Sequence, residues 1–380
     1  MYISTLRLMN WRNFKAVNVS LGERMFVTGP NASGKSNLLD VFRFLKDIAK
    51  PDGGLQKAIK ARGGLVKIRS LSARRNSQVE IEVELTDRKT NTQWGYELHL
   101  FHKKNGSDQF EISKERVAKN GSIILDRPDS KDKEDVVRLT QTSLEQVMAN
   151  RDFREVAKHF SSIRYMHLVP QLIRHSNAFP GPGPEEDPFG QHFMERMAKT
   201  LGATRQNRLK KIEDALLYAV PQLKHLKYVK DEMGNPHLEV NSHHWHSHAG
   251  NQREDQFSDG TLRLVGFLWS LLETESLLLL EEPELSLHDT AVDKLPSLIY
   301  RLKKKNAQVF ISTHSQALLA DRGIGGEEIL ILMPCKEGTC VQVASDLKDV
   351  RILLESGMSP ADVVIPKTAP ENIHQLGLLK

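Results

Sequence analysis

The chain has 380 residues, of which 39% are hydrophobic and 27% charged, and its formal net charge is +5. This composition is ordinary for a globular protein and excludes disordered and fibrous classes, while the positive charge is compatible with nucleic acid without establishing it. No apolar run reaches the ~18 residues of a membrane span, and the N-terminus lacks the apolar core of a signal peptide, so we expect a cytoplasmic protein with no membrane partner.

The first third of the chain predicts strands around one helix. Residues 1–28 alternate like two strands and then run apolar into a glycine turn, and 36–50 carry apolar residues at helical spacing. Residues 53–79 hold seven Lys or Arg and no acid. Two-fold alternation over 78–126, with Asn-Gly pairs at 105–106 and 120–121, predicts an antiparallel sheet.

The middle third has weaker patterns. Residues 143–160 have a helical pattern and 162–169 the pattern of a strand, before prolines and glycines at 179–190 indicate a linker or loop. Two amphipathic helices are expected across 190–220 and a strand pair across 226–246.

Helices and strands alternate in the last third. A helix ending at Glu273 precedes an apolar strand at 277–281, a helix over 289–305, a strand at 308–313 and a final apolar strand in "EEILILM". Such alternation predicts a parallel sheet with helices on its faces. Two cysteines in "PCKEGTC", Cys335 and Cys340, are interpreted as reduced thiols in a hairpin turn, because a disulfide framework would need more cysteines and an oxidising compartment.

The stretch "GPNASGKS" at 29–36 matches the phosphate-loop pattern G-x-x-x-x-G-K-[ST], with an apolar strand before it and an amphipathic helix after it. Glycines let backbone N–H groups turn toward phosphate oxygens, Lys35 can reach the β- and γ-phosphates, and Ser36 can bind Mg²⁺. A structural glycine turn is the alternative. The context favours an ATP site with Mg²⁺.

Three later motifs add candidate residues to the ATP site. The strand "LLLLEEPE" ends in Glu281, expected to serve the metal, and Glu282, expected to orient and deprotonate the attacking water. His314, after the strand in "VFISTHSQ", is placed to contact the γ-phosphate or the water. "FSDGT" offers Ser258 and the N–H of Gly260 at a helix start, an anion site suited to a γ-phosphate, although a plain helix cap would have the same pattern.

In this order, "GPNASGKS", "FSDGT", "LLLLEEPELSLHD" and "FISTHS" resemble the phosphate loop, signature motif, acidic strand with D-loop and switch histidine of ABC-type ATPases. The branch that the chain resembles is the soluble one with SMC and RecF proteins and the AAA-family ATPases of phage-defence and overcoming-lysogenization-defect systems, whose N-terminal strand is similar to "NWRNFK". Departures are Glu281 where most members have Asp, Asp259 and Thr261 in the signature, and Asp289 in the D-loop.

The resemblance implies an α/β P-loop NTPase fold of ABC-ATPase type, with a mainly parallel central sheet, an added antiparallel β-subdomain and a helical lobe. Residues 1–170 and 255–345 would form the ATPase head, 171–254 the helical lobe, and 346–380 a C-terminal extension. The nucleotide-binding residues would be Gly29, Pro30, Asn31, Ala32, Ser33, Gly34, Lys35, Ser36, Asn37, Ser258 and Gly260. The catalytic residues would be Lys35, Glu282 and His314, and the metal ligands Ser36, Glu281 and Gln171.

In that family the signature motif of one subunit caps the nucleotide of another, so ATP would join a head-to-tail homodimer or higher oligomer. The chain lacks long coiled coils and a nuclease-type carboxylate set after His314, so an effector, a nuclease or toxin, would be encoded separately in an anti-phage defence or DNA-maintenance system. The alternatives are a non-hydrolysing ATP-dependent clamp or scaffold and a RecF-like repair ATPase.

Two clusters leave alternatives open. The basic stretch 57–75 either contacts DNA or RNA phosphates or forms a solvated basic edge. The histidines of "HHWHSH" (243–248) fit the two faces of a strand better than a zinc site, because no cysteine or carboxylate set accompanies them.

Overall fold

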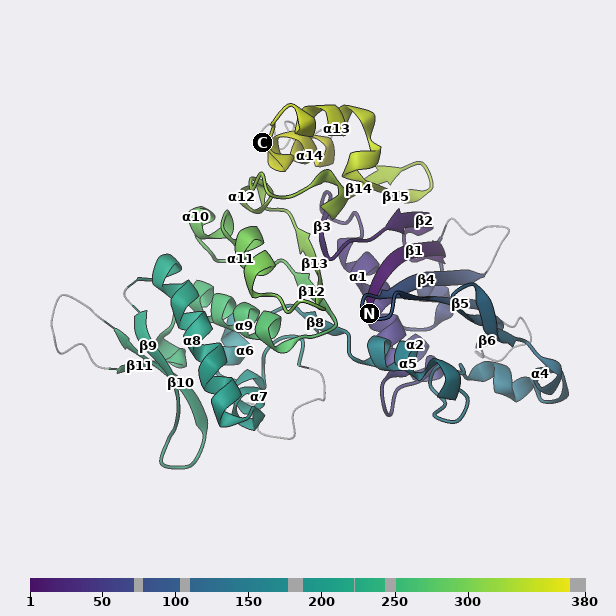
Figure 1. The fold of residues 1–380 in the computed structure, drawn as a ribbon, viewed down its shortest axis with the longest axis horizontal. Coiled ribbons are helices and arrows are strands. Elements are labelled where there is room, and N and C mark those ends of the chain that lie inside the picture. Colours follow the sequence, from purple (N-terminus) through teal and green to yellow (C-terminus); the bar gives the residue numbers. More distant parts are fainter. Residues whose placement is uncertain (72–77, 103–109, 177–186, 222, 243–250, 370–380) are drawn as a thin grey trace, which may run out of the picture.

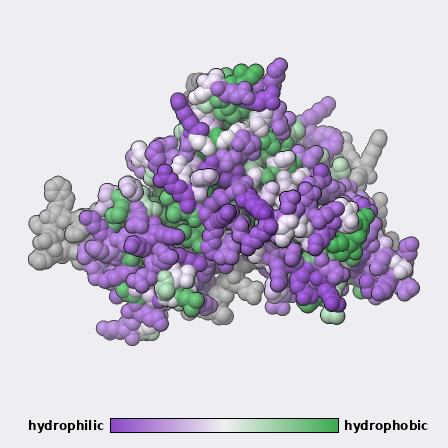
Figure 2. All heavy atoms as spheres, in the orientation of Figure 1, coloured by the Kyte–Doolittle hydropathy of each residue, from purple (hydrophilic) through white to green (hydrophobic). Residues whose placement is uncertain are grey.

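The computed structural model describes residues 1–71, 78–102, 110–176, 187–221, 223–242 and 251–369. Figure 1 shows the purple and blue N-terminal strands on one side of the molecule, a teal lobe on the other, and the yellow C-terminal helices at the top. Over the described ranges no helix is long and apolar enough to cross a membrane, and the face drawn in Figure 2 is mostly hydrophilic with scattered apolar side chains.

A mainly parallel sheet of six strands forms the centre, in the order β15-β14-β3-β13-β12-β8. Its strands are β3 (Arg24–Thr28), β8 (Arg164–Met166), β12 (Leu277–Glu281), β13 (Gln308–Thr313), β14 (Ile329–Cys335) and β15 (Gly338–Val343). All pairs are parallel except β14 with β15. Every residue of β3 and β13 is buried, as expected for strands covered on both faces. The predicted parallel sheet is confirmed.

A second sheet, in the order β2-β1-β4-β5-β6-β7, is antiparallel throughout. Its strands are β1 (Tyr2–Trp11), β2 (Phe14–Ser20), β4 (Val79–Asp87), β5 (Thr92–His102), β6 (Phe110–Lys119) and β7 (Ser122–Arg127). The predicted turn at Asn120 and Gly121 is confirmed, because both residues have the positive φ that this dipeptide favours. The other predicted turn, at 105–106, lies outside the described residues.

Helix α1 (Lys35–Ala49) packs between these two sheets. Phe42 meets Phe310 of β13 edge to face, with 5.2 Å between ring centroids. On its other side, Phe44 lies 5.3 Å from the ring of Trp11 in β1. Nine of the 15 residues of this amphipathic helix are buried, so the two sheets cover more of its surface than a single apolar stripe would require. The N-terminus of α1 is thereby held at the ends of the parallel strands.

The lobe drawn in teal and green in Figure 1 combines helices with a small sheet. Its helices are α6 (Pro170–Arg174), α7 (Phe193–Lys199), α8 (Gly202–Ala219) and α9 (Asp259–Glu273), and its strands, in the order β11-β10-β9, are β9 (Leu223–Lys230), β10 (Pro236–Ser242) and β11 (Asn251–Arg253). The predicted strand pair is confirmed as far as residue 242, whereas the histidines at 243–248 lie outside the described residues. Helix α9 is buried from Gly260 to Leu272 and joins the lobe to the central sheet.

Two predicted helices are wrong in extent. Over 143–160, the helix α5 (Arg154–Ser161) starts late, because turns before it bind Glu115 through the N–H groups of Ser143 and Leu144. Over 289–305 there are two helices, α10 (Asp289–Val292) and α11 (Leu295–Leu302). Pro296 lies in the first turn of α11, where its missing N–H costs nothing, whereas inside one continuous helix it would remove a backbone hydrogen bond.

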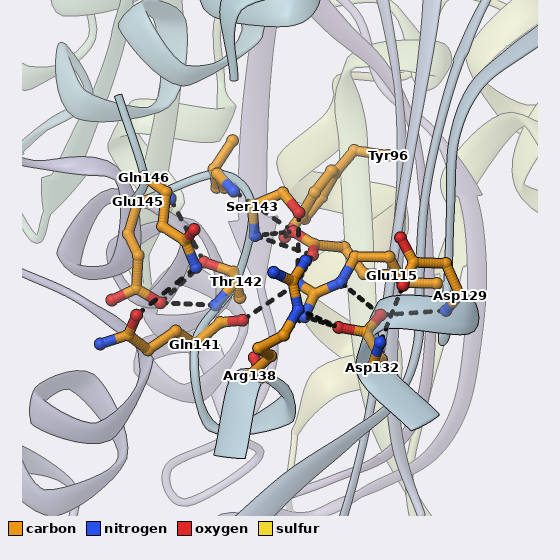
Figure 3. Close-up of polar contacts among 12 residues, drawn as sticks. Tyr96, Glu115, Asp129, Asp132, Arg138, Gln141, Thr142, Ser143, Glu145 and Gln146 are labelled. Atoms are coloured by element: carbon orange, nitrogen blue, oxygen red, sulfur yellow. Dashed lines mark hydrogen bonds and ion pairs between the residues drawn. The ribbon is translucent and has the colours of Figure 1, made fainter. Parts of the chain in front are cut away.

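Those turns belong to a buried polar network at the end of the antiparallel sheet (Figure 3). Arg127 binds Asp132 through Nε and Nη2, each at 2.9 Å, and Glu115 through Nη1 at 2.9 Å. Tyr96 donates to Glu115 at 3.3 Å, and Arg138 donates to Asp132 at 3.0 Å. Because Glu115 and Asp132 have no exposed side-chain surface, these partners are required to offset the desolvation of both carboxylates.

The hairpin of β14 and β15 is confirmed, but the reduced thiols predicted in it are wrong. Cys335 and Cys340 form a disulfide with 5.9 Å between their Cα atoms. The prediction weighed the number of cysteines and overlooked that a tight hairpin brings residues five apart within bonding range.

The remaining helices are α2 (Leu55–Ala61), α3 (Leu65–Ile68), α4 (Ser130–Glu134), α12 (Gln316–Leu319), α13 (Lys348–Glu355) and α14 (Pro360–Thr368). The 3₁₀ turns are η1 (Val136–Thr140), η2 (Arg151–Phe153), η4 (Glu254–Gln256), η5 (Gly326–Glu328) and η6 (Ala344–Asp346).

Candidate functional site: the carboxyl ends of the parallel strands

The loop 29–36 joins β3 directly to α1, so it lies at the carboxyl edge of the parallel sheet. Gly34 caps α1 with a φ of 96°, and a Cβ there would lie 2.2 Å from Nδ2 of Asn13. The positive φ and the close approach of Asn13 both require glycine at this position. The first turn of α1 has no side-chain cap and no acid, so its N–H groups are available to an anion. This backbone fits the phosphates of a nucleotide.

Lys35 is buried inside this loop. Its Nζ donates to the carbonyls of Gly29 at 3.0 Å and Pro30 at 3.2 Å, and it lies 3.3 Å from Nδ1 of His314. Burial lowers the pKa of Lys35, while nearby glutamates, first Glu282, oppose that shift. The ammonium group is held where a phosphate bound by the loop would meet it.

Ser36 and Glu281 meet although 245 positions separate them in the chain. The Ser36 hydroxyl donates to Oε1 of Glu281, and the hydroxyl of Tyr165 donates to Oε2. A hydroxyl beside a carboxylate is the hard oxygen donor set that Mg²⁺ prefers, so these residues fit the metal that the sequence predicted. Burial and the neighbouring Glu281 raise the pKa of Tyr165, which keeps its hydroxyl a donor.

Glu282 and His314 form the next pair, with 3.2 Å between Oε1 and Nε2. An ammonium can only donate, so the contact from Lys35 makes Nδ1 the acceptor and leaves the hydrogen on Nε2, facing Glu282. Partial burial and Lys35 lower the pKa of His314, in agreement with this neutral form. Glu282 has a φ of 45°, an uncommon backbone conformation for a residue other than glycine.

Glu284 fixes the acidic segment from behind. It is 7% exposed and accepts a hydrogen bond from the Thr313 hydroxyl at the end of β13. Burial raises its pKa. Glu284 was not predicted as a site residue, because its partner follows from strand order and from no local motif.

Asn13 is another residue that the sequence analysis missed. Its Nδ2 donates to the carbonyl of Ser33 and to the hydroxyl of Thr339, both at 2.8 Å, and its Oδ1 accepts from Asn37 at 2.7 Å. One amide therefore connects the phosphate loop, α1 and the β14–β15 hairpin. The only sequence signal was its place in "NWRNFK", which drew attention to the segment and to no single residue.

The other predicted residues lie apart from this group. Gln171 donates to Asp259 at 2.8 Å, beside Arg174 at 2.6 Å, so it contacts the start of α9. Ser258 is exposed and caps α9 by accepting from the N–H of Thr261 at 3.2 Å. Gly260 is buried. Among the described residues, no hydrogen bond or ion pair joins Ser258 or Gln171 to the loop 29–36.

The basic stretch 57–75 divides into two kinds of residue. Arg62 is structural, because it binds Asp40 at 2.8 Å and Asp47 at 2.9 Å with only 6% of its side chain exposed. Lys57, Lys60 and Lys67 are exposed, whereas positions 74 and 75 lie outside the described residues.

Comparisons with known proteins agree with this fold. A family model described as "AAA domain, putative AbiEii toxin, Type IV TA system" matches residues 24–320. A crystal structure of an SMC head bound to the C-winged helix domain of ScpA is 13% identical, covers 92% of this chain and 100% of that chain, and has a TM-score of 0.52. A Pyrococcus furiosus Smc head domain, with an extended coiled coil and bound to the C-terminal domain of ScpA, is 12% identical, covers 94% and 99%, and has a TM-score of 0.51.

Identities this low show the fold alone, and that fold is the ABC-ATPase head that the sequence predicted. A search of curated proteins finds no match.

Proposed function

Because the chain belongs to the AAA-domain family described as putative AbiEii toxin, Type IV TA system, and has the fold of an SMC head, we propose that it binds ATP with Mg²⁺ and hydrolyses it. One observation carries this proposal. Lys35, Ser36, Glu281, Glu282 and His314 come from three separate segments and meet at the carboxyl ends of adjacent parallel strands.

Each of these side chains has a distinct task in the proposed reaction. Lys35 neutralises charge on the β- and γ-phosphates, and the N–H groups of the loop orient them. Ser36 and Glu281 would hold Mg²⁺, which supplies further neutralisation of the phosphate oxygens. Glu282 orients the attacking water and accepts its proton. The Nε2–H of His314 holds the Glu282 carboxylate in place, and Nδ1 of His314 accepts from Lys35, the residue that contacts the phosphates.

A second copy of the chain would complete the site. Ser258 is exposed at the start of α9, and among the described residues of one chain no hydrogen bond or ion pair joins it to the phosphate loop. Its hydroxyl and the N–H of Gly260 could therefore bind the γ-phosphate held by another copy. ATP would join two copies head to tail, and hydrolysis would release them.

The family description and the ScpA-bound SMC heads support a protein partner for the ATP-dependent dimer. We propose that this partner is a separately encoded effector, a nuclease or toxin, in anti-phage defence. The exposed Lys57, Lys60 and Lys67 support contact with DNA or RNA phosphates. A non-hydrolysing clamp is the second candidate, because Lys35 and Ser258 alone would suffice for ATP-driven assembly.

Three variants test this function. Lys35→Ala should lose ATP binding, Glu282→Gln should bind ATP and accumulate as a dimer without turnover, and Ser258→Arg should bind ATP as a monomer and lose both dimerisation and hydrolysis. The measurements are ATP titration calorimetry, light scattering with ATP, and phosphate release, with the exposed Lys305→Ala as control. Normal hydrolysis by Ser258→Arg would exclude the shared site, and unchanged biological activity of Glu282→Gln would favour the clamp.

A further inference from the structure

We propose that Tyr165 is a positioning residue that orients the Glu281 carboxylate for Mg²⁺, an inference that rests on the proposed ATPase function. The two oxygens of Glu281 are held by two different hydroxyls. Ser36 donates to Oε1 from α1, and Tyr165 donates to Oε2 from β8. Ser36 belongs to the phosphate-loop motif, whereas no motif predicted the tyrosine.

The strand register places Tyr165 on the correct face. Strand β8 pairs in parallel with β12, and Tyr165 is opposite Leu279, two residues before Glu281. Because residues two apart on a strand point to the same face, the side chains of Tyr165 and Glu281 extend from the same face of the sheet. β8 is one of the two edge strands of the sheet and lies next to β12, so the hydroxyl approaches Glu281 from the side opposite β13.

Arg43 fixes the tyrosine ring in turn. Its guanidinium carbon lies 4.0 Å from the ring centroid of Tyr165, a close cation–π contact. Arg43 follows Ser36 by seven residues on α1, which is about two helical turns, so both residues lie on one face of the helix. This face of α1 therefore restrains the Glu281 carboxylate in two ways, directly through the Ser36 hydroxyl and indirectly through Arg43, which packs on the ring of Tyr165.

A glutamate needs this support more than an aspartate would. Its carboxylate has one more rotatable bond, so more side-chain freedom is lost when it is held in one orientation. Mg²⁺ requires near-ideal octahedral geometry, so a carboxylate that rotates freely binds it poorly. Glu281 is the position at which this chain departs from the aspartate of most ABC-type ATPases, and Tyr165 supplies the extra constraint.

Tyr165→Phe removes only the hydroxyl. Residues that orient metal ligands typically contribute 10- to 100-fold to metal affinity, so the Mg²⁺ concentration that supports half-maximal ATP binding should rise by about tenfold or more. ATP titration calorimetry at a series of Mg²⁺ concentrations measures this in the full chain without requiring turnover. Tyr300→Phe, at an exposed position, is the matched control and should match the unmodified protein.

A double-mutant cycle separates orientation from a general structural effect. In Glu281→Asp the carboxylate is one carbon shorter and cannot reach both hydroxyls, so adding Tyr165→Phe should cause little further change in Mg²⁺ dependence. An unchanged Mg²⁺ dependence in Tyr165→Phe, or an equal shift in both backgrounds, would overturn the proposal. If the unmodified protein binds Mg²⁺–ATP without releasing phosphate, the ATPase proposal fails while this test of Tyr165 still decides.

Discussion

Replacing Arg127 by Met tests the buried polar network. The Arg127 side chain is 3% exposed, and it neutralises two carboxylates with no exposed surface, Glu115 and Asp132. Methionine replaces the aliphatic part of the arginine side chain and has no charge, so both carboxylates would remain buried without the guanidinium that they share. Breaking a buried ion pair from one side costs about 3–5 kcal/mol, and we expect the free energy of unfolding to fall by that amount.

The pH dependence has a defined sign. Burial raises the pKa of Glu115 even with Arg127 present, and removing the guanidinium raises it further. A carboxyl whose folded-state pKa is raised binds a proton more readily in the folded state, so protonation relieves the penalty as the pH falls. The destabilisation of Arg127→Met should therefore be smaller at pH 5 than at pH 8.

Urea unfolding followed by tryptophan fluorescence measures both effects. Arg116→Met is the control, because Arg116 forms an exposed pair with Asp126 on the same sheet and should contribute less than about 1 kcal/mol. The double variant Arg127→Met with Glu115→Gln should recover part of the loss. If Arg127→Met unfolds within about 1 kcal/mol of the unmodified protein at pH 8, the network does not stabilise the fold as argued.

Three further predictions concern His159, Asn13 and Gly260. Burial lowers the pKa of His159 to about 3, so as the pH falls below 6.5 the imidazole takes up a proton in the unfolded state and stays neutral in the folded state. The free energy of unfolding should therefore fall by about 1.4 kcal/mol between pH 7.5 and 5.5. An equal fall in His159→Gln would contradict this. Asn13→Ala removes one hydrogen bond to the loop, at Ser33, and one to α1, at Asn37, and should lower ATP affinity by roughly tenfold as measured by calorimetry. Unchanged affinity would show that the loop keeps its conformation without Asn13. A Cβ at Gly260 would lie 2.4 Å from the carbonyl oxygen of Ser286, so Gly260→Ala should bind ATP yet lose ATP-driven dimerisation in light scattering, and a normal dimer would refute the shared site.

Local sequence patterns predicted the framework of the candidate site. The loop 29–36 and the apolar strands that end at Glu281 and Thr313 depend on short-range rules of glycine turns and strand periodicity. Parallel strands align their carboxyl ends, so these rules were enough to expect Lys35 and Glu281 on one edge. The structure brings them together there, and the catalytic role of Lys35 and the metal-binding role of Glu281 stay predictions.

Local rules failed where a contact depends on register or on distant segments. The helix predicted from residue 289 breaks before Pro296, and the disulfide of Cys335 and Cys340 depends on hairpin geometry that the number of cysteines does not contain. Arg62 was grouped with a basic surface, although its carboxylate partners bury it.

The sequence by itself determined the order of the motifs, the central parallel sheet and the family, because each depends on residues close together in the chain. Only the tertiary structure decided that Asn13 supports the phosphate loop and that Tyr165, on an edge strand, binds Glu281. Asn13 and Tyr165 lie 20 and 116 positions from their partners, and only strand pairing and the packing of α1 between two sheets bring them into contact.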